Sequence, residues 1–190
     1  MKKEERHKII IIPVSYVDGK PRFLTVRDRR HKEWIFVTGG CRKREYANPF
    51  RSALRELEEE TRGIVILKRC FYTHFEFQYN TRSHEETLQD LKQGLDVTIT
   101  YHVYVVDYPV SRSVQLNLIK KFNDERARIE IRKVKKLPIR KTYDENDMMS
   151  FDTLDEFCKR NCWKFIIDKV INNPQFYGAL NNKNKERFTY

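Results

Sequence analysis

The chain has 190 residues, of which 39% are hydrophobic and 34% are charged, and its formal net charge is +11. An aromatic content of 13% excludes a disordered chain, because disorder combines high charge with few aromatic residues. The longest apolar run, Ile9–Ile12, is far too short to cross a bilayer, so no membrane insertion is expected. A surface this basic attracts polyanions, with RNA, DNA, inositol phosphates and an anionic membrane surface as candidates.

The length predicts one domain over 1–190, with a core of about 8–140 and a helical C-terminal region of about 150–190. Residues 1–6 open with charges and lack the apolar core of a signal peptide. We therefore expect an intracellular, cytoplasmic protein with reduced thiols. Cys158 and Cys162 lie four apart in a predicted helix, and one such pair is more often two ordinary helix cysteines than a zinc site.

The first third of the chain predicts a hairpin and a short strand. Lys8–Val17 is apolar and β-branched, and Asp18–Pro21 is a turn before a second strand over Arg22–Val26. A basic loop over 27–32 leads to a short strand at Trp34–Val37, which ends at Thr38-Gly39-Gly40. These segments predict the edge of a sheet followed by a glycine-containing loop.

A helix is predicted directly after this loop. Asn48 suits the N-cap, and Pro49 suits the first helical position, where its missing N–H costs nothing. Leu54 and Leu57 continue an apolar stripe that begins at Phe50. Gly63 is the expected stop.

The remaining segments alternate between strand and helix patterns, which predicts an α/β or α+β domain. Strands are expected at Ile64–Leu67, Phe71–Tyr79, Val97–Val106 and Arg128–Leu137. Helices are expected at Ser113–Asn123, Phe151–Arg160 and Asn161–Asn172, and Ser83–Lys92 is expected to be a short helix or an ordered loop. The tail from Asn173 is rich in Asn and Lys and is expected to be loosely held.

Three carboxylates in the predicted helix indicate chemistry. Residues three and four apart share a helix face, so Glu56, Glu59 and Glu60 fall within an arc of about 100°. Crowded carboxylates repel one another, and a hard divalent cation with oxygen ligands, Mg²⁺ or Mn²⁺, resolves the conflict. A solvated acidic helix face is the simpler explanation of the glutamates alone, but the glycine loop, the capped helix and the following glycine form a larger pattern.

The stretch Gly39–Gly63 resembles the Nudix box, in which Gly, five residues, Glu, seven residues and Arg-Glu-apolar-x-Glu-Glu-x-Gly-apolar recur. The second half of the motif matches at Arg55, Glu56, Leu57, Glu59 and Glu60. Counting back from the arginine, the sequence departs from the first half of the motif. Cys41 stands at the glycine position and Ala47 at the upstream glutamate position, with Glu45 two residues away. Two residues instead of one also separate the last glutamate from the next glycine.

The resemblance implies an α/β/α sandwich around a mixed sheet, with a helical insertion and C-terminal helices, and an active site on the box helix and the loop before it. It implies that Mg²⁺ or Mn²⁺ is held by Glu56, Glu59 and Glu60. The catalytic residues it implies are Glu59, Glu60, Arg55 and a downstream acid, Glu130, with Glu125 as the second choice. The loop residues expected to bind phosphate are Gly39, Gly40, Lys43 and Arg44.

The implied activity is hydrolysis of a phosphoanhydride bond, and the 5′ cap of mRNA is the expected substrate, released as m7GDP. The net charge favours a polyanion, and the segment Asn123–Val134 resembles a region of the Nudix decapping enzymes of large DNA viruses. The residues expected to contact RNA phosphates are Arg29, Arg30, Lys32, Arg132, Lys133 and Lys135. Two alternatives stay open: a diphosphoinositol polyphosphate, dinucleoside polyphosphate or nucleoside triphosphate pyrophosphohydrolase, and a catalytically decayed Nudix module that binds RNA.

Overall fold

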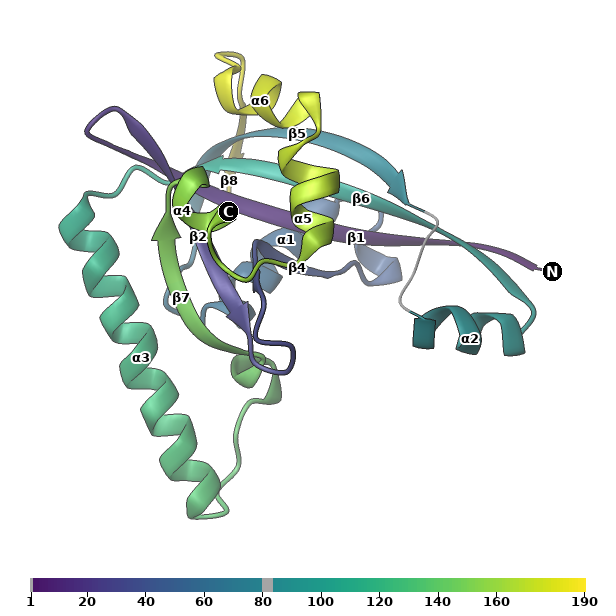
Figure 1. The fold of residues 1–190 in the computed structure, drawn as a ribbon, viewed down its shortest axis with the longest axis horizontal. Coiled ribbons are helices and arrows are strands. Elements are labelled where there is room, and N and C mark those ends of the chain that lie inside the picture. Colours follow the sequence, from purple (N-terminus) through teal and green to yellow (C-terminus); the bar gives the residue numbers. More distant parts are fainter. Residues whose placement is uncertain (1, 80–83) are drawn as a thin grey trace.

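The computed structural model describes residues 2–79 and 84–190 and, for 84–87, the backbone alone. Within these residues, eight strands form one mixed sheet in the order β3-β2-β1-β6-β5-β8, with β4 paired to β1 and β7 to β2 (Figure 1). The strands are β1 (Lys2–Val17), β2 (Lys20–Asp28), β3 (Trp34–Ile35), β4 (Val37–Gly40), β5 (Arg69–Tyr79), β6 (Leu95–Asp107), β7 (Asn146–Asp152) and β8 (Glu186–Thr189). The mixed α/β fold expected from the sequence is confirmed.

Helices cover both faces of the sheet. They are α1 (Pro49–Glu60), α2 (His84–Lys92), α3 (Arg112–Val134), α4 (Leu154–Cys158), α5 (Lys164–Ile166) and α6 (Pro174–Asn181). Two 3-10 turns, η1 (Lys43–Glu45) and η2 (Lys141–Asp144), and a π-helical turn, η3 (Ile167–Ile171), complete the elements. No helix of the described residues has the length and apolar character needed to span a bilayer.

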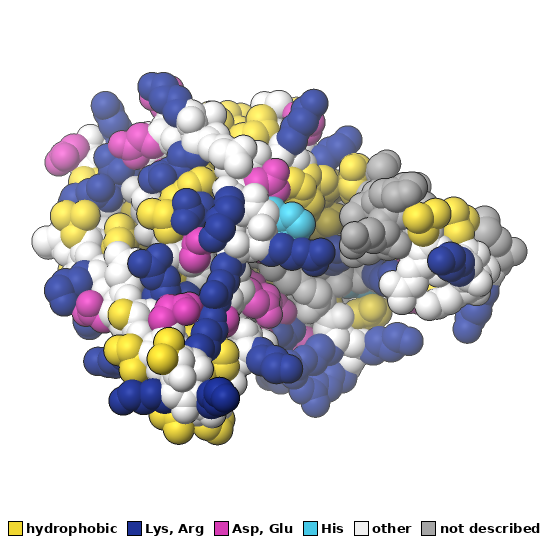
Figure 2. Space-filling model, turned by 60° about the horizontal axis from the view of Figure 1, so that its bottom comes forward, with side chains coloured by type: hydrophobic (Ala, Val, Ile, Leu, Met, Phe, Trp, Pro, Cys, Tyr) yellow, Lys and Arg dark blue, Asp and Glu magenta, His cyan; other side chains and the backbone are white. Residues whose placement is uncertain are grey.

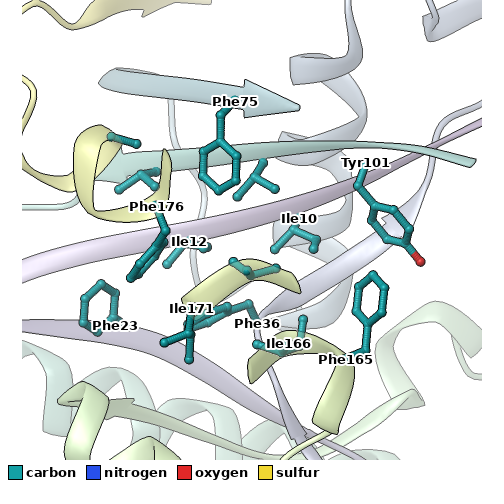
Figure 3. Close-up of a cluster of buried hydrophobic side chains, with 14 of the residues drawn as sticks. Ile10, Ile12, Phe23, Phe36, Phe75, Tyr101, Phe165, Ile166, Ile171 and Phe176 are labelled. Carbon is teal, nitrogen blue, oxygen red and sulfur yellow. The ribbon is translucent and has the colours of Figure 1, made fainter. Parts of the chain in front are cut away.

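The central strand β1 divides the core into two layers, since alternate side chains of a strand point to opposite faces. Ile10 and Ile12 pack with Phe165 and Phe176 from the C-terminal helices (Figure 3). On the opposite face Ile9 and Ile11 belong to the cluster formed with α1 and α3. The strand begins six residues before the predicted Lys8, because its first residues pair in parallel with the start of β6.

The helix predicted within the box-like stretch, called the box helix below, forms as α1. Proline occupies its first turn, and Phe50, Ala53 and Leu57 are buried beneath it. Asn48 is the N-cap residue, although its side chain makes no capping hydrogen bond. The hydroxyl of Thr61 donates to the carbonyl of Leu57 at 2.6 Å, and the chain then turns away through two residues of positive φ.

The predicted strand over Arg128–Leu137 is wrong. Residues 128–134 are the last seven residues of α3, a single helix of 23 residues, and 135–137 follow its end. The buried residues Leu118, Phe122 and Ile129 are spaced by four and seven, which is the helical period. Ile131, which suggested alternation with Ile129, is 54% exposed, so the helical stripe determined the structure.

The C-terminal third is more regular than expected and is not purely helical. β7 pairs with β2, so the helix predicted over Phe151–Arg160 begins only at Leu154. The prediction of a loose tail from Asn173 is wrong, because Phe176 of α6 is fully buried and β8 adds to the edge strand β5. Ile64–Leu67 is not a strand. The Ser83–Lys92 segment contains α2, with Ser83 itself outside the described residues.

Arg62 joins the end of the box helix to the second half of the chain. It has a φ of 58° and is 3% exposed. Its guanidinium donates to the backbone carbonyls of Tyr143 at 2.8 Å, of Phe122 at 3.4 Å and of Asn146, and it lies 4.4 Å from the centre of the Phe122 ring. Burial lowers the pKa of Arg62 to about 10, so the side chain is still charged at neutral pH. One buried cation therefore satisfies three distant carbonyls.

We predict that Arg62→Met lowers the free energy of unfolding by about 3 kcal/mol, because it leaves buried carbonyls without donors. Urea unfolding followed by circular dichroism measures this. Arg51→Met, at an exposed position of α1, should change stability by less than about 0.5 kcal/mol. Equal effects of the two substitutions would contradict the anchoring role of Arg62.

Candidate active site

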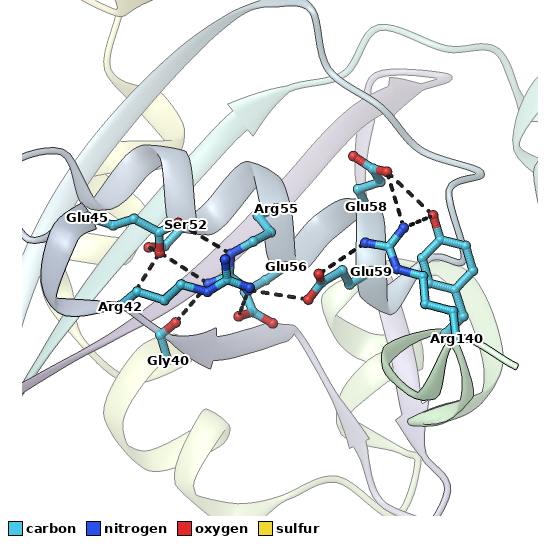
Figure 4. Close-up of polar contacts among 10 residues, drawn as sticks. Gly40, Arg42, Glu45, Ser52, Arg55, Glu56, Glu58, Glu59 and Arg140 are labelled. Atoms are coloured by element: carbon cyan, nitrogen blue, oxygen red, sulfur yellow. Dashed lines mark hydrogen bonds and ion pairs between the residues drawn. The ribbon is translucent and has the colours of Figure 1, made fainter.

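Arg55 lies between the box glutamates and bonds to two of them (Figure 4). Its Nη1 donates to Oε1 of Glu56 at 2.6 Å and to Oε2 of Glu59 at 3.3 Å, and its Nη2 donates to the carbonyl of Gly40 at 3.1 Å. Burial opposes the charge, but the hydrogen bonds that Arg55 donates to Glu45 and the negative charge of Glu56 raise the pKa of Arg55 above its ordinary value. The arginine is a permanent cation inside the acidic group.

Glu45 is the upstream partner of Arg55. It accepts from the hydroxyl of Ser52 at 2.6 Å, from the backbone N–H of Arg42 at 3.1 Å and from Arg55 Nη2 at 3.3 Å. Burial acts to raise the pKa of Glu45, but these three hydrogen bonds outweigh it and lower the pKa to about 2. Ala47, which the spacing had placed at the glutamate position, is exposed.

The position of Glu45 explains the irregular spacing of the motif. Five residues separate Gly39 from Glu45, as in the Nudix box, and nine instead of seven separate Glu45 from Arg55. The two additional residues fall between η1 and α1, where the chain turns into the helix. The mismatches at Cys41 and Ala47 therefore follow from two additional residues after Glu45, and the spacing from Gly39 to Glu45 matches the first half of the motif.

The side chain of Glu56 occupies the space where a side chain on residue 39 would begin, which favours glycine there. A Cβ atom on Gly39 would lie 2.1 Å from the carboxyl carbon of Glu56, whereas a Cβ on Gly40 would meet no atom within 4 Å. The backbone of β4 thus lies directly against a carboxylate of the box helix. This contact fixes where that carboxylate points.

Residues from the second half of the chain complete the site. Asn146, at the start of β7, donates to the carboxylate of Glu60. Burial, the negative charge and hydrogen bond of Glu145, and the charges of Glu56 and Asp28 raise the pKa of Glu60 well above 4.5. Burial also raises the pKa of Glu56, against the opposing effect of Arg55. Burial and the neighbouring carboxylates therefore favour the protonated form of Glu60.

Glu59 is held between two arginines. Arg140, which precedes η2, donates to its Oε1 at 3.2 Å, opposite the contact with Arg55. Arg140 also lies 4.3 Å from the ring centre of Tyr143, and Glu58 points to the same pair (Figure 4). No local pattern in the sequence indicated Arg140, Glu145 or Asn146, because they are about 80 residues from the box and reach it only through the fold.

The other predicted site residues are dispersed. Glu130 is exposed on α3 and pairs with Lys133 at 3.1 Å and with Arg29 at 3.3 Å. Among the described residues, no hydrogen bond or ion pair joins Glu130 to Glu56, Glu59 or Glu60. Lys43 and Arg44 are exposed on η1. The structure therefore brings Glu145, and not Glu130, to the box carboxylates.

Acidic neighbours already pair with several of the residues predicted to bind RNA. Arg29 and Lys133 both contact Asp144, and Lys32 contacts Asp147 at 2.5 Å. Arg132 instead donates to the backbone carbonyl of Pro138. Arg30 and Lys135 are exposed, and no ion pair links either of them to another described residue.

A surface hollow of about 620 Å³ adjoins the acidic group. It is lined by Asp28, Arg29, Arg30, His31, Asp144 and Glu145, so carboxylates and cations face the same space. A larger cavity of about 730 Å³ lies among the ends of β1 and β6, the start of β5 and β8, and no box residue lines it. The smaller hollow is the better candidate for substrate, since it alone of the two borders the carboxylates.

The donor set fits a hard divalent cation. Glu56, Glu59, Glu60 and Glu145 offer carboxylate oxygens, and burial, together with the neighbouring carboxylates, raises the pKa values of Glu56 and Glu60. These oxygens are not gathered within 4.8 Å of one another as a ready ligand set, and Arg55 stands between two of them. A cation at this position would take over part of the charge neutralisation that Arg55 and Arg140 provide.

The chain is similar to solved structures at low sequence identity. The Nudix domain of NrtR from Shewanella oneidensis, solved with ADP-ribose, has a TM-score of 0.53 and 11% identity over 87% of this chain and 83% of its own. The Nudix hydrolase RenU from M. smegmatis gives a TM-score of 0.49, with 12% identity over 84% and 78%. The Ap4A hydrolase of C. elegans gives 0.38, with 15% identity over 56% and 71%.

Neither a protein-family model nor a curated protein sequence matches the chain. The superposition on the NrtR domain, together with the mixed sheet between two helical layers, shows that the chain has the Nudix fold.

We predict that Gly39→Ala weakens Mn²⁺ binding at least about tenfold, because the added methyl group displaces the Glu56 carboxylate. Titration of the metal-free protein, followed by electron paramagnetic resonance of free Mn²⁺, measures this. Gly40→Ala is the matched control and should bind Mn²⁺ as the unchanged protein does. If the two variants bind alike, Glu56 is not a ligand.

We predict that Glu60→Gln stabilises the metal-free protein. Since folding raises the pKa of Glu60 above 4.5, the folded state holds its proton more tightly, and stability falls as the pH rises above about 4.5. Glutamine imitates the protonated acid, so Tm at pH 8 should rise by about 2–4 °C, the shift that about 1 kcal/mol gives in a chain of this size. Differential scanning calorimetry at pH 5 and pH 8 should show the gain shrinking at the lower pH, and a Tm decrease at pH 8 would refute the crowding of charge.

Proposed function

We propose that this protein is a metal-dependent hydrolase that cleaves a phosphoanhydride bond. The observation that carries the proposal is the buried acidic group that Glu56, Glu59 and Glu60 form with Glu145. This group lies next to a hollow lined with arginine. Like charges are concentrated in this way where a cation and a polyphosphate are to be bound together. The Nudix fold supports this chemistry by analogy.

Each side chain has a distinct part in the proposed reaction. A bound Mg²⁺ or Mn²⁺ would neutralise phosphate oxygens and lower the pKa of an attacking water. Glu56, Glu59 and Glu60 would hold the cation, and Arg55 orients the first two through its bifurcated contact. The raised pKa of Glu60 suits it to accept a proton from the water once a bound cation has favoured its ionised form.

Arg140 is a candidate phosphate contact. In this structure it pairs with Glu59, and about half of its side chain is exposed. If the Glu59 side chain rotates to bind a metal ion, the Arg140 guanidinium loses its partner and becomes available to an oxygen of the substrate. Arg30, exposed at the rim of the hollow, would add a second contact.

Capped RNA is the substrate class that we propose. Lys and Arg side chains cover much of the face drawn in Figure 2 and surround smaller groups of acidic side chains. With a net charge of +11, such a surface binds a long phosphate chain through many weak contacts. The exposed end of α3 supplies Arg128, Lys135 and Lys136 to this surface.

A small polyphosphate is the second candidate, and the hollow motivates it. Its volume of about 620 Å³ lies within the range of about 300–1,000 Å³ that small-molecule sites occupy. The NrtR domain of the same fold was solved with ADP-ribose, a nucleoside diphosphate ester. A decayed binding module is the least favoured alternative, because the acidic group, its orienting arginine and the glycine that touches Glu56 are all present.

The test is an Mg²⁺- or Mn²⁺-dependent hydrolysis assay on cap-labelled RNA, with free cap dinucleotide, a diphosphoinositol phosphate, ADP-ribose and nucleoside triphosphates in parallel. We predict that Glu59→Gln lowers turnover at least about a hundredfold, more than the loss of an outer partner of a metal site usually costs. Glu58→Gln, which changes the neighbouring glutamate of the same helix, should retain most of the activity.

The outcomes separate the candidates. Release of cap diphosphate from long RNA, with little turnover of the cap dinucleotide, supports decapping. Turnover of small polyphosphates alone supports the second candidate and leaves the metal site in place. If Glu59→Gln and the unchanged protein hydrolyse substrate equally fast, the proposed metal site is wrong.

A further inference from the structure

A second group of ligand-type side chains lies on the sheet, outside the box. His7 of β1, His102 of β6, and His74 and Glu76 of β5 are on the face that also packs against α1. In the register of the strands, His102 is directly opposite Glu76, and His74 is opposite Tyr104 on the same face. Three strands thus bring four polar side chains together where a sheet face is usually apolar.

The group is compact. Oε1 of Glu76 lies 2.8 Å from Nδ1 of His102 and 3.3 Å from Nε2 of His74. One ligand atom from each of these three residues can be chosen so that all lie within 4.8 Å of one another. His102 is 5% exposed, whereas His74 and Glu76 reach solvent, so the group has a buried base and an open side.

A chain of contacts continues behind His102. Its Nε2 lies 2.7 Å from Nδ1 of His7, and Nε2 of His7 lies 3.4 Å from Oε1 of Glu5. Four contacts therefore connect Glu5, His7, His102, Glu76 and His74. Each contact joins two atoms that are acceptors unless one of them carries a proton.

The neutral histidines do not supply enough protons. A neutral imidazole has one N–H, so His7 and His102 together offer two protons to the three contacts from Glu5 to Glu76. If His102 donates to His7 and His7 donates to Glu5, the lone pair of His102 Nδ1 faces the Glu76 carboxylate. This Nδ1 atom is buried and has no hydrogen bond of good geometry among the described residues. With these tautomers no proton lies between His102 Nδ1 and the Glu76 carboxylate, and a cation at this point would interact with both.

We propose that His74, Glu76 and His102 bind a first-row transition-metal dication of the Zn²⁺ type, with His7 and Glu5 orienting His102 from behind. Zinc commonly takes two imidazoles, one carboxylate and a water, and bonds of about 2.0–2.2 Å place its ligand atoms about 3.3–3.6 Å apart. The two separations from Glu76, 2.8 Å and 3.3 Å, are close to these values, and all three ligand atoms lie within 4.8 Å of one another. A ligating histidine usually donates its other ring N–H to an acceptor behind it, and here His7, itself beside Glu5, is that acceptor.

The physical chemistry of the group agrees with this assignment. Burial lowers the pKa of both His74 and His102, which favours the neutral form that a metal requires. Nitrogen ligands select zinc-type cations, whereas the all-oxygen box site suits Mg²⁺ or Mn²⁺. The two sites would therefore take different metals.

The histidine site adjoins the box loop. The His7 ring lies 4.3 Å from the ring of Tyr46, which directly follows η1, and the carbonyl of His7 accepts from the N–H of Cys41 at 2.9 Å. Binding at His102 would therefore fix the strand against which the box loop rests.

The test is isothermal titration calorimetry of the metal-free full chain with Zn²⁺, in excess Mg²⁺ to fill oxygen sites. We expect one zinc site per chain, with an affinity at least about tenfold weaker in His74→Ala and in Glu76→Gln, both changes at exposed positions. Gln78→Ala, exposed on the same strand and face, is the matched control and should bind zinc normally. Glu59→Gln should also keep this site, which separates it from the box.

Nuclear magnetic resonance of the imidazole nitrogens gives an independent readout. Zinc should shift a ring nitrogen of His74 and of His102 while Glu59→Gln makes no difference. The proposal is overturned if no zinc binds, if zinc binding is lost only in Glu59→Gln, or if one of the three histidines is found protonated at neutral pH and so supplies the missing proton.

Discussion

The structure is organised around the repulsion between carboxylates on one turn and a half of a helix. Glu56, Glu59 and Glu60 are partly or wholly withdrawn from water, where like charges are screened least. Arg55 and Arg140 reduce the repulsion from two sides, and the raised pKa of Glu60, which favours its protonated form, reduces it further. Much of what surrounds α1, from the tight contact at Gly39 to the amide of Asn146, holds these groups in place despite their charge.

The parts of the fold with a clear period could be predicted from the sequence. The box helix, the hairpin and the two long strands follow from local patterns, and the three helix carboxylates follow from spacing alone. The segment Arg128–Leu137 was wrongly predicted as a strand, because isoleucines that alternate with charged residues imitate a strand pattern. The apolar stripe that packs the helix on the core starts ten residues earlier, at Leu118. The short β7 and β8 carry no period long enough to detect.

The rest of the candidate site could not be predicted, for a physical reason. Glu145, Arg140 and Asn146 act through positions that only the docking of η2 and β7 creates, and a single acidic or basic residue in a loop carries no signal. Glu45 lies close to the box helix in sequence, but counting a fixed number of residues back from Arg55 led to Ala47. Such a count does not detect an insertion. The histidine group likewise depends on the register of three strands, which no local pattern contains.

The contacts of Arg62 have a consequence for how the molecule is made. The carbonyls that it satisfies belong to residues 60, 81 and 84 positions further along the chain. Contacts between such distant residues form only after long loops have closed. During synthesis, the box would therefore emerge well before the segments that fix its end, and the nascent amino-terminal half would carry the motif without a finished site.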